Sequence, residues 1–254
     1  MFKNFIRYFF RVFGLEIRRF TQAGGPPMTA VPEFLRISGL LGAELILDVG
    51  ANIGQFYQSV RSNGYQGEII SFEPNPQVHA ELQRVAAGDR NWMLEKIALG
   101  DKSEFLTLHQ TQDSLFSSLK LPNEELAQTV HGSVQSEVQV AVKPLMEVWN
   151  SLELDKKLVA LKCDTQGNEM EMLRGAENHL DQVVSILMEL TFRPLYSGES
   201  DFFEVSTWLY KRGYVLTNLF ETYRAHHPLN ELVQVDAVFA RLQRFENVKM
   251  KTKT

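Results

Sequence analysis

A turn rich in glycine closes the first apolar run of the chain, and its composition suits ligand binding. Residues 48–54 read Asp-Val-Gly-Ala-Asn-Ile-Gly. Gly50 and Gly54 allow the backbone to bend sharply and to approach a ligand closely. Asn52 is expected to cap the helix that follows through its side-chain oxygen. The free amides at the start of that helix can receive a carboxylate or a phosphate.

The spacing of this turn and a later carboxylate together indicate the kind of ligand. The dinucleotide fingerprint requires Gly-x-Gly-x-x-Gly, and Asn52 occupies the position of its second glycine, the one that admits a pyrophosphate. This departure from the fingerprint counts against NAD and FAD as ligands. Glu73 follows Asp48 by 25 residues, a separation that fits one helix and one strand. A carboxylate there can accept hydrogen bonds from both hydroxyls of a ribose, so the pair predicts a nucleoside ligand.

Two further carboxylates are candidates for the chemistry itself. Asp164 and Glu189 each follow an apolar run that is typical of a buried strand. Ligands of open α/β sheets bind outside the carboxyl ends of the strands, so both side chains are expected at that edge. Asp164 is the first choice for acceptor binding or proton removal, with capping of a helix near residue 168 as the alternative. Glu189 is expected to orient a substrate hydroxyl, and Glu169 is a weaker candidate.

The sequence leaves the question of a metal open. Asp164, Glu189 and one of the six histidines could form an oxygen-rich site for magnesium. No His-x-x-x-His or similar pair of ligands supports zinc.

These residues need a scaffold, and the hydrophobic pattern predicts one. Apolar runs and amphipathic segments alternate through the main body, which implies a doubly wound, mostly parallel β-sheet covered by helices on both faces. The expected strands are residues 45–49, 68–72, 92–99, 158–163, 183–188, 214–219 and 233–240, and the expected helices are 54–62, 77–87, 168–175 and 202–212.

The segment between residues 103 and 149 breaks this rhythm. Residues 105–109 and 137–142 have the pattern of short strands, and a polar stretch lies between them. Loops of this length in compact domains are usually functional or disordered. The insertion is therefore predicted to form a flap over the ligand edge of the sheet.

Composition and charge limit the classes of protein that this chain can be. Its 254 residues, 44% of them hydrophobic, suit one large domain, expected at residues 30–243. The net charge of −5 argues against a general nucleic-acid binder. A polar stretch at residues 244–254 is expected to form a flexible tail.

The N-terminal segment differs from the rest of the chain. Its first 20 residues contain five Lys or Arg, one Glu and six Phe, and residues 1–24 are expected to form a basic, aromatic helix. The charges interrupt the apolar run too often for it to span a bilayer. Packing against the domain or a partner is the first interpretation, and peripheral contact of residues 1–20 with an anionic membrane surface is the second. A cytoplasmic location is expected.

Several short motifs, taken as a set, resemble the FkbM family of class I S-adenosylmethionine-dependent methyltransferases. They are DVGANIG from Asp48, SFEPNP from Ser71, ALGD from Ala98, LKCDTQGNE from Leu161 and ELTFRPLY from Glu189. The resemblance covers about residues 46–219 and keeps the order of the motifs. Where the family tends to have Tyr or Phe, this chain has Asn168.

The resemblance implies a Rossmann-like fold, with a mostly parallel sheet and an antiparallel last strand. It also implies S-adenosylmethionine as the cofactor. Asp48 and the backbone of residues 50–54 would hold its methionine end, Glu73 its ribose, and Ala98 and Leu99 would lie near its adenine. The implied reaction is O-methylation of a sugar or another polyhydroxylated small molecule, so the acceptor could be a glycan.

Other interpretations stay open at this point. N-methylation of an amine would use the same cofactor. A nicotinamide-dependent oxidoreductase is disfavoured by Asn52. A non-catalytic protein of the same fold that docks through its N-terminus is disfavoured by the intact set of Glu73, Asp164 and Glu189. The sequence does not determine the oligomeric state.

Overall fold

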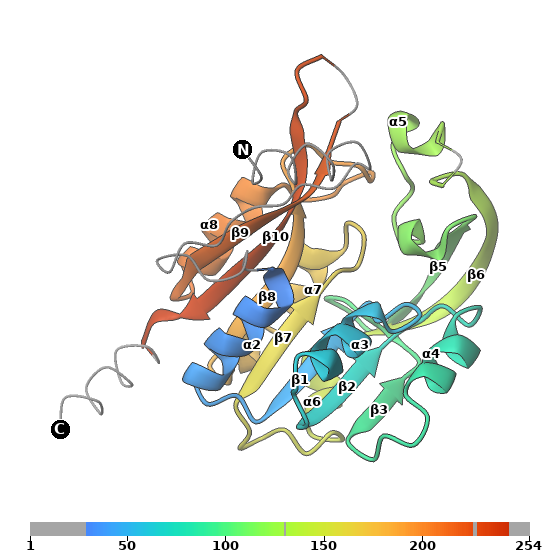
Figure 1. Cartoon of the computed structure of the whole chain (residues 1–254). Coiled ribbons are helices and arrows are strands. Elements are labelled where there is room, and N and C mark those ends of the chain that lie inside the picture. The colour runs from blue at the N-terminus through green and yellow to red at the C-terminus, as the bar shows by residue number, and fades with distance from the viewer. Residues whose placement is uncertain (1–28, 130, 226–227, 244–254) are drawn as a thin grey trace, which may run out of the picture.

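The computed structural model describes residues 29–129, 131–225 and 228–243, and a seven-stranded sheet forms their centre (Figure 1). The strand order is β3-β2-β1-β7-β8-β10-β9. Strand β10 pairs antiparallel with both of its neighbours, and the other pairings are parallel. The predicted fold, a mostly parallel sheet with an antiparallel last strand, is confirmed. The strands are β1 (Leu45–Val49), β2 (Glu68–Phe72), β3 (Trp92–Glu95), β7 (Val159–Cys163), β8 (Val183–Thr191), β9 (Tyr214–Arg224) and β10 (Leu232–Arg241).

Helices cover both faces of this sheet because its central strands are apolar on both sides. All five residues of β1 are buried, and their side chains alternate between two hydrophobic clusters. Leu45 and Leu47 belong to one cluster and Ile46 to the other, as the two-residue period of a strand requires. Helices α2 (Ala30–Leu40) and α3 (Gln55–Ser62) cover one face, whereas α6 (Leu145–Trp149), α7 (Glu169–Gly175) and α8 (Phe202–Tyr210) cover the other.

The predicted insertion forms a second, smaller sheet. Its order is β4-β6-β5, with β4 (Ala98–Leu99), β5 (Glu104–Thr111) and β6 (Val134–Lys143). The β5–β6 hairpin carries the short helices η1 (Ser114–Phe116) and α5 (Glu124–Ala127) between its strands, to one side of the main sheet (Figure 1). We call residues 104–143 the flap. Both strands of the flap are longer than the sequence predicted.

One predicted strand is wrong as a single element. Residues 92–99 divide into β3, at the edge of the main sheet, and β4, which pairs with β6. The residues of β3 are partly buried or exposed, whereas Ala98 and Leu99 are buried. The chain therefore leaves the main sheet to bury these two residues beneath the flap.

Several element ends also differ from the prediction. Strand β8 continues to Thr191, because β10 pairs with it as far as Gln234. Glu189 consequently lies inside β8 rather than after it. Helix α3 begins one residue later than predicted, after Gly54, and α4 (His79–Val85) is shorter than the predicted 77–87. Strands β9 and β10 extend the predicted late strands into a longer hairpin.

The described elements run from α2, which begins at Ala30, to β10, which ends at Arg241. The predicted N-terminal helix at residues 1–24 and the predicted tail at residues 244–254 lie outside the described residues. Within the described ranges, no helix combines the length and the apolar character needed to cross a membrane.

Candidate active site

A cavity lies at the carboxyl edge of β1, β2 and β7, where the flap faces the main sheet. The volume that the centre of a water molecule can occupy in it is about 70 Å³, and the empty space counted out to open solvent is about 630 Å³. Four segments of the main domain and two of the flap surround it. The residues that line it include Gly50, Asn52, Glu73, Asn75, Ala98, Leu99, Asp164, Thr165, Gln166, Asn168, Ser114, Leu115, Ser117 and Ser118.

The glycine turn brings the ends of β1 and β7 into close contact. Gly50 has a φ of +76°, and a Cβ atom at this position would lie 1.8 Å from the backbone oxygen of Asp164. Gly54 has a φ of +91° and starts α3, where a Cβ would meet Leu82 at 3.0 Å. Gly50 lines the cavity and Gly54 does not. The first glycine therefore shapes the site, and the second allows α3 to pack against α4.

Asn52 occupies the left-handed region, with a φ of 47°, but it does not cap α3 as predicted. The N-cap of α3 is Gly54, which provides no side-chain hydrogen bond. The Asn52 side-chain oxygen instead accepts hydrogen bonds from the Ile53 amide at 2.7 Å and from the Ser114 hydroxyl of the flap at 3.0 Å. The asparagine thus connects the turn to the flap.

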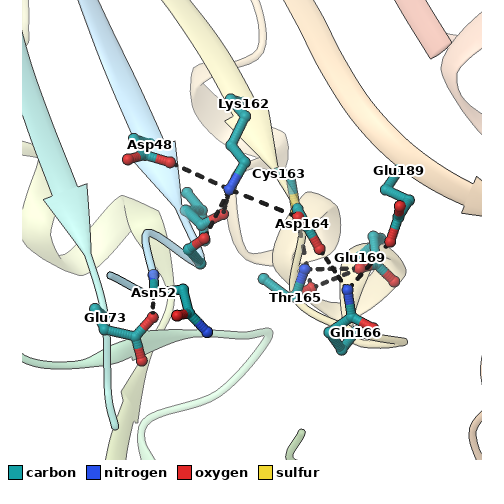
Figure 2. Close-up of polar contacts among 12 residues, drawn as sticks. Asp48, Asn52, Glu73, Lys162, Cys163, Asp164, Thr165, Gln166, Glu169 and Glu189 are labelled. Carbon is teal, nitrogen blue, oxygen red and sulfur yellow. Dashed lines mark hydrogen bonds and ion pairs between the residues drawn. The ribbon is translucent and has the colours of Figure 1, made fainter. Parts of the chain in front are cut away.

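Glu73 projects into the cavity with both carboxylate oxygens hydrogen-bonded to the backbone. The Asn52 N–H donates to Oε2 at 2.7 Å (Figure 2). The Asn75 N–H donates to Oε1, also at 2.7 Å. Burial raises the pKa of Glu73 to about 7, although these two hydrogen bonds oppose the shift. Each oxygen keeps a second acceptor position. Glu73 can therefore accept hydrogen bonds from two adjacent ribose hydroxyls.

A second observation fits a nucleoside in this cavity. The side-chain Nδ2 of Asn75 is buried and has no hydrogen-bond partner among the described residues, and Asn75 lines the cavity. Unpaired buried donors are rare in native structures, and an acceptor atom of a bound ligand would satisfy this one. Ala98 and Leu99 add an apolar surface, and the Asn168 side chain fixes it by donating to the Leu99 carbonyl at 3.1 Å.

Asp48 lies behind the turn and does not line the cavity. Its carboxylate is fully buried, accepts a hydrogen bond from Ser71 at 3.1 Å, and lies 3.2 Å from the ammonium of Lys162 (Figure 2). Burial raises the pKa of Asp48, and the charge of Lys162 opposes that shift. A contact of this carboxylate with a cofactor would require the ion pair to open. In this structure its partner is Lys162.

Lys162 is a site residue that the sequence reasoning missed. Its Nζ donates to the Gly50 carbonyl at 2.6 Å and lies 3.9 Å from a carboxylate oxygen of Asp164. Burial alone would lower the pKa of Lys162, but the charges of Asp48 and Asp164 outweigh it and the net shift is upward. The sequence contained a signal for this residue, namely a lysine within an otherwise apolar strand, because such a lysine is buried only when it is paired.

Asp164 and Glu189 lie near each other and share one amide group. The Gln166 Nε2 donates to Asp164 Oδ1 at 2.8 Å and to Glu189 Oε2 at 3.1 Å (Figure 2). The Tyr196 hydroxyl donates to the Gln166 Oε1 at 2.9 Å. Burial raises the pKa of Glu189 well above its usual range, and the charges of Asp164 and Asp236 add to the shift. Sequence reasoning identified neither Gln166 nor Asp236.

Asp164 is available for chemistry because it does not act as a helix cap. The N-cap of α7 is Asn168, and the Asp164 side chain keeps 36% of its surface exposed. Glu169, rather than Asp164, stabilises the loop between β7 and α7. Its Oε1 accepts hydrogen bonds from the Thr165 amide at 2.8 Å and the Thr165 hydroxyl at 3.0 Å. Glu169 therefore holds the loop that carries Asp164.

The structure does not support the suggested magnesium site. Among the described residues, no group of three or more His, Cys, Asp or Glu side chains is arranged to hold a metal ion. The two histidines of the flap have carboxylate neighbours within the flap itself. His109 lies 2.9 Å from Glu137, and His131 lies 3.7 Å from Asp113.

Comparison with known proteins identifies relatives of this chain. The family described as "Methyltransferase FkbM domain" matches residues 48–216. Methyltransferase 1 of Beauveria bassiana is 28% identical over 195 residues, covering 67% of this chain and 72% of that protein. The 2-O-methyltransferase NoeI of Sinorhizobium fredii is 21% identical over 193 residues, covering 72% and 79%. The crystal structure of methyltransferase FkbM from Methylobacillus flagellatus aligns with a TM-score of 0.48 at 15% identity, covering 82% of this chain and 48% of that one.

Proposed function

Since this chain belongs to the FkbM family of methyltransferases, we propose that it methylates a hydroxyl of a sugar or another polyhydroxylated small molecule with S-adenosylmethionine. One observation carries the proposal. A single cavity has Glu73, whose carboxylate can accept hydrogen bonds from a ribose, in one wall and the partly exposed carboxylate of Asp164 in another. A nucleoside cofactor and a base for its reaction would therefore meet in one place.

The residues of the cavity fit this cofactor. Glu73 would accept the ribose hydroxyls, and the apolar surface of Ala98 and Leu99 would cover the adenine. The Gly50 and Asn52 backbone would face the methionine end. When bound, S-adenosylmethionine supplies a methyl group on a positively charged sulfur, which is already a good leaving group. The protein then has to position the acceptor and remove its proton.

Asp164 is the residue to which we assign proton removal. Its Oδ1 is fixed by Gln166 at 2.8 Å, and its Oδ2 faces the Lys162 ammonium at 3.9 Å. This arrangement orients the carboxylate while leaving part of it exposed. An acceptor hydroxyl would lose its proton to Asp164 as its oxygen takes the methyl group. Glu189 would orient the hydroxyl from the adjacent strand.

The choice of oxygen as the methylated atom has one support outside the structure. A relative of similar length is described as a 2-O-methyltransferase. N-methylation would use the same cavity and base, so it is an outcome that the experiment must separate. A nicotinamide oxidoreductase has no support from the relatives, and Asn52 at the second glycine position disfavours it.

The proposal can be tested by methyl transfer from tritiated S-adenosylmethionine. The acceptor panel would contain methyl glucoside, methyl galactoside and methyl fucoside, with glucosamine as the amine counterpart. We expect transfer to a glycoside hydroxyl. In Asp164→Asn the rate should fall by about 100-fold or more, with cofactor affinity within about threefold of the wild type. The matched control is Glu221→Gln, an exposed carboxylate of β9.

Two results would contradict the proposal. Transfer to glucosamine nitrogen without transfer to any glycoside would assign the enzyme to amines. An undiminished rate in Asp164→Asn would show that another group removes the proton.

A further inference from the structure

A second cavity adjoins the first on the other side of Asp164. The volume that the centre of a water molecule can occupy in it is about 250 Å³, and it lies between helices α2 and α3 and the facing parts of β7, β8 and β10. Its walls include Val31, Phe56, Leu187, Asp164, Glu189 and Asp236. Asp164 is thus a wall of both cavities. A group in the second cavity can reach the same carboxylate that faces the first.

Three carboxylates form a row across this cavity because of strand register. Asp236 of β10 is the direct antiparallel partner of Glu189 on β8. Cys163 of β7 pairs with Met188, which places Asp164 beside Glu189. Like charges directly opposite each other in a sheet are destabilising. The fold groups these carboxyl groups at an edge of the sheet where a ligand could use them, and burial together with the charges of Asp164 and Asp236 raises the pKa of Glu189.

The carboxylates of this row keep unused hydrogen-bonding capacity. The side-chain oxygens of Asp236 accept no hydrogen bond from any residue in the described ranges, and burial followed by the charge of Asp164 raises its pKa to about 6. Glu189 receives the amides of Gln166 and Gln234 on the same oxygen, Oε2, at 3.1 and 3.2 Å. Its other oxygen remains available for a ligand.

The rest of the cavity indicates which ligand chemistry fits. Lys162 also lines it, but its ammonium is engaged by Asp48 and the Gly50 carbonyl. No cation is therefore free there to hold a phosphate or a carboxylate, among the residues that the structure describes in this wall. Apolar side chains of Val31, Phe56 and Leu187 complete it. Carboxylates beside an apolar wall suit a neutral ring that has hydroxyls on its rim and C–H groups on its face.

We propose that the second cavity binds the methyl acceptor as an uncharged sugar, with Asp236 and Glu189 accepting hydrogen bonds from neighbouring hydroxyls of its ring. The apolar wall would contact the face of the ring, and the hydroxyl to be methylated would lie at Asp164. Asp236 is then a specificity residue rather than a catalytic one. This inference rests on the proposed function, since it assumes that the first cavity holds the cofactor.

Saturation-transfer NMR tests this site without requiring turnover. The sample is the full chain saturated with S-adenosylhomocysteine, and the probes are methyl α-glucopyranoside, methyl α-galactopyranoside and methyl α-mannopyranoside. We expect saturation of the ring protons of at least one glycoside. The signal should fall at least about fivefold in Asp236→Asn, because a carboxylate that accepts from two hydroxyls loses one acceptor position. Glucose 6-phosphate should give a weaker signal than methyl α-glucopyranoside.

A second variant and a control distinguish loss of the sugar site from misfolding of the protein. Val31→Trp would fill the cavity from the rim on α2, where Val31 is only partly buried, and should remove the signal. Glu221→Gln removes an exposed carboxylate from the same β9–β10 hairpin and should leave the signal unchanged. Calorimetric titration with S-adenosylhomocysteine on each sample reports the state of the first cavity.

The outcomes separate this inference from the proposed function. If the folded wild type does not bind S-adenosylhomocysteine, the proposed function itself is contradicted. Intact S-adenosylhomocysteine binding without saturation of any glycoside would overturn only the acceptor site. A glycoside signal that persists in Asp236→Asn and Val31→Trp, or a stronger signal from glucose 6-phosphate, would overturn it as well.

Discussion

At the scale of single residues, the site depends on charges buried in pairs. Lys162 and Asp48 neutralise each other beneath the glycine turn, and Lys162 also holds the Gly50 carbonyl. Removing one partner of a buried ion pair leaves an uncompensated charge, which is more costly than removing both. The pair therefore fixes the end of β1 against β7.

Replacing Lys162 alone should destabilise the folded protein. We expect Lys162→Met to lower the free energy of unfolding by about 3–5 kcal/mol, because Asp48 would stay buried without its partner. The double variant Asp48→Asn/Lys162→Met should recover most of that loss. Urea unfolding followed by circular dichroism measures both. A loss below about 1 kcal/mol in the single variant would show that the pair has little structural role.

Cofactor binding should depend on pH through Glu73. Burial raises its pKa to about 7 in the free protein, and the ionised form offers the most acceptor positions to ribose hydroxyls. Protonation therefore competes with binding. Affinity for S-adenosylhomocysteine should be constant well above pH 7 and weaken towards tenfold per pH unit well below it. Calorimetry from pH 8 to pH 5.5 measures this dependence.

The control for this pH dependence is Glu73→Gln, which cannot ionise. It should bind more weakly, with an affinity that no longer changes with pH in this range. Glu169 also has a pKa of about 7 because it is buried, but it does not line the cavity. The same pH dependence in Glu73→Gln would assign the effect to Glu169 or to another group.

Single residues also mark the limit of what the sequence could predict. Gly50, Asn52 and Glu73 were found because local spacing determines where a turn and the next strand end fall. Asp236 could not be found this way, because it reaches the site through antiparallel pairing with Glu189, which lies 47 positions earlier in the chain. Lys162 was overlooked inside an apolar run, although a buried lysine always requires partners.

At the scale of elements, the flap is attached to the main domain by side chains of two loops. The Tyr196 hydroxyl donates to the Phe116 carbonyl of the flap at 3.1 Å and to Gln166 at 2.9 Å. The Ser118 hydroxyl donates to the Gln166 carbonyl at 2.6 Å. The loop that carries Asp164 is therefore connected to the flap directly through Ser118 and indirectly through Tyr196.

Removing that hydroxyl should loosen the flap. We expect Tyr196→Phe to increase hydrogen exchange of the amides in residues 112–120 and to weaken S-adenosylhomocysteine binding by about three- to tenfold, equivalent to roughly 1 kcal/mol for a lost hydrogen bond. Exchange in β1 and β7 should not change. Unchanged exchange in residues 112–120 would show that Tyr196 does not hold the flap in place.

The elements themselves were predicted better than their boundaries. Strands β1, β2 and β7 are short, apolar and buried on both faces, so pattern alone located them. The division of residues 92–99 could not be predicted, because it depends on the burial of Ala98 and Leu99 under the distant strand β6. The position of Glu189 could not be predicted either, because it lies inside β8 only where pairing with β10 extends that strand.

At the scale of the whole molecule, the described residues contain both cavities, whereas the N-terminal segment is predicted to pack against the domain or a partner, or to contact a membrane surface. Among the residues that the structure describes, those that line the two cavities run from Val31 onwards. The five basic and six Phe residues of the first 20 positions suit an interface with a partner or an anionic membrane surface. Catalysis and docking should therefore be separable.

Deleting residues 1–24 tests that separation. The shortened chain should bind S-adenosylhomocysteine within about twofold of the wild type, and it should lose co-sedimentation with vesicles rich in phosphatidylserine or association with a partner. The binding is measured by calorimetry, and the sedimentation by comparison with neutral vesicles. Loss of cofactor binding in a folded deletion variant would show that this segment belongs to the active site.

The central claim is that the cavity beside the glycine turn binds S-adenosylmethionine through Glu73, and calorimetric titration of the purified chain tests it most directly. We expect micromolar binding by the wild type and none by Glu73→Ala. The exposed Glu81→Ala on α4 should bind like the wild type, and a parallel titration with NADH should show no binding. Failure of the folded wild type to bind S-adenosylmethionine, or unchanged affinity in Glu73→Ala, would contradict the account.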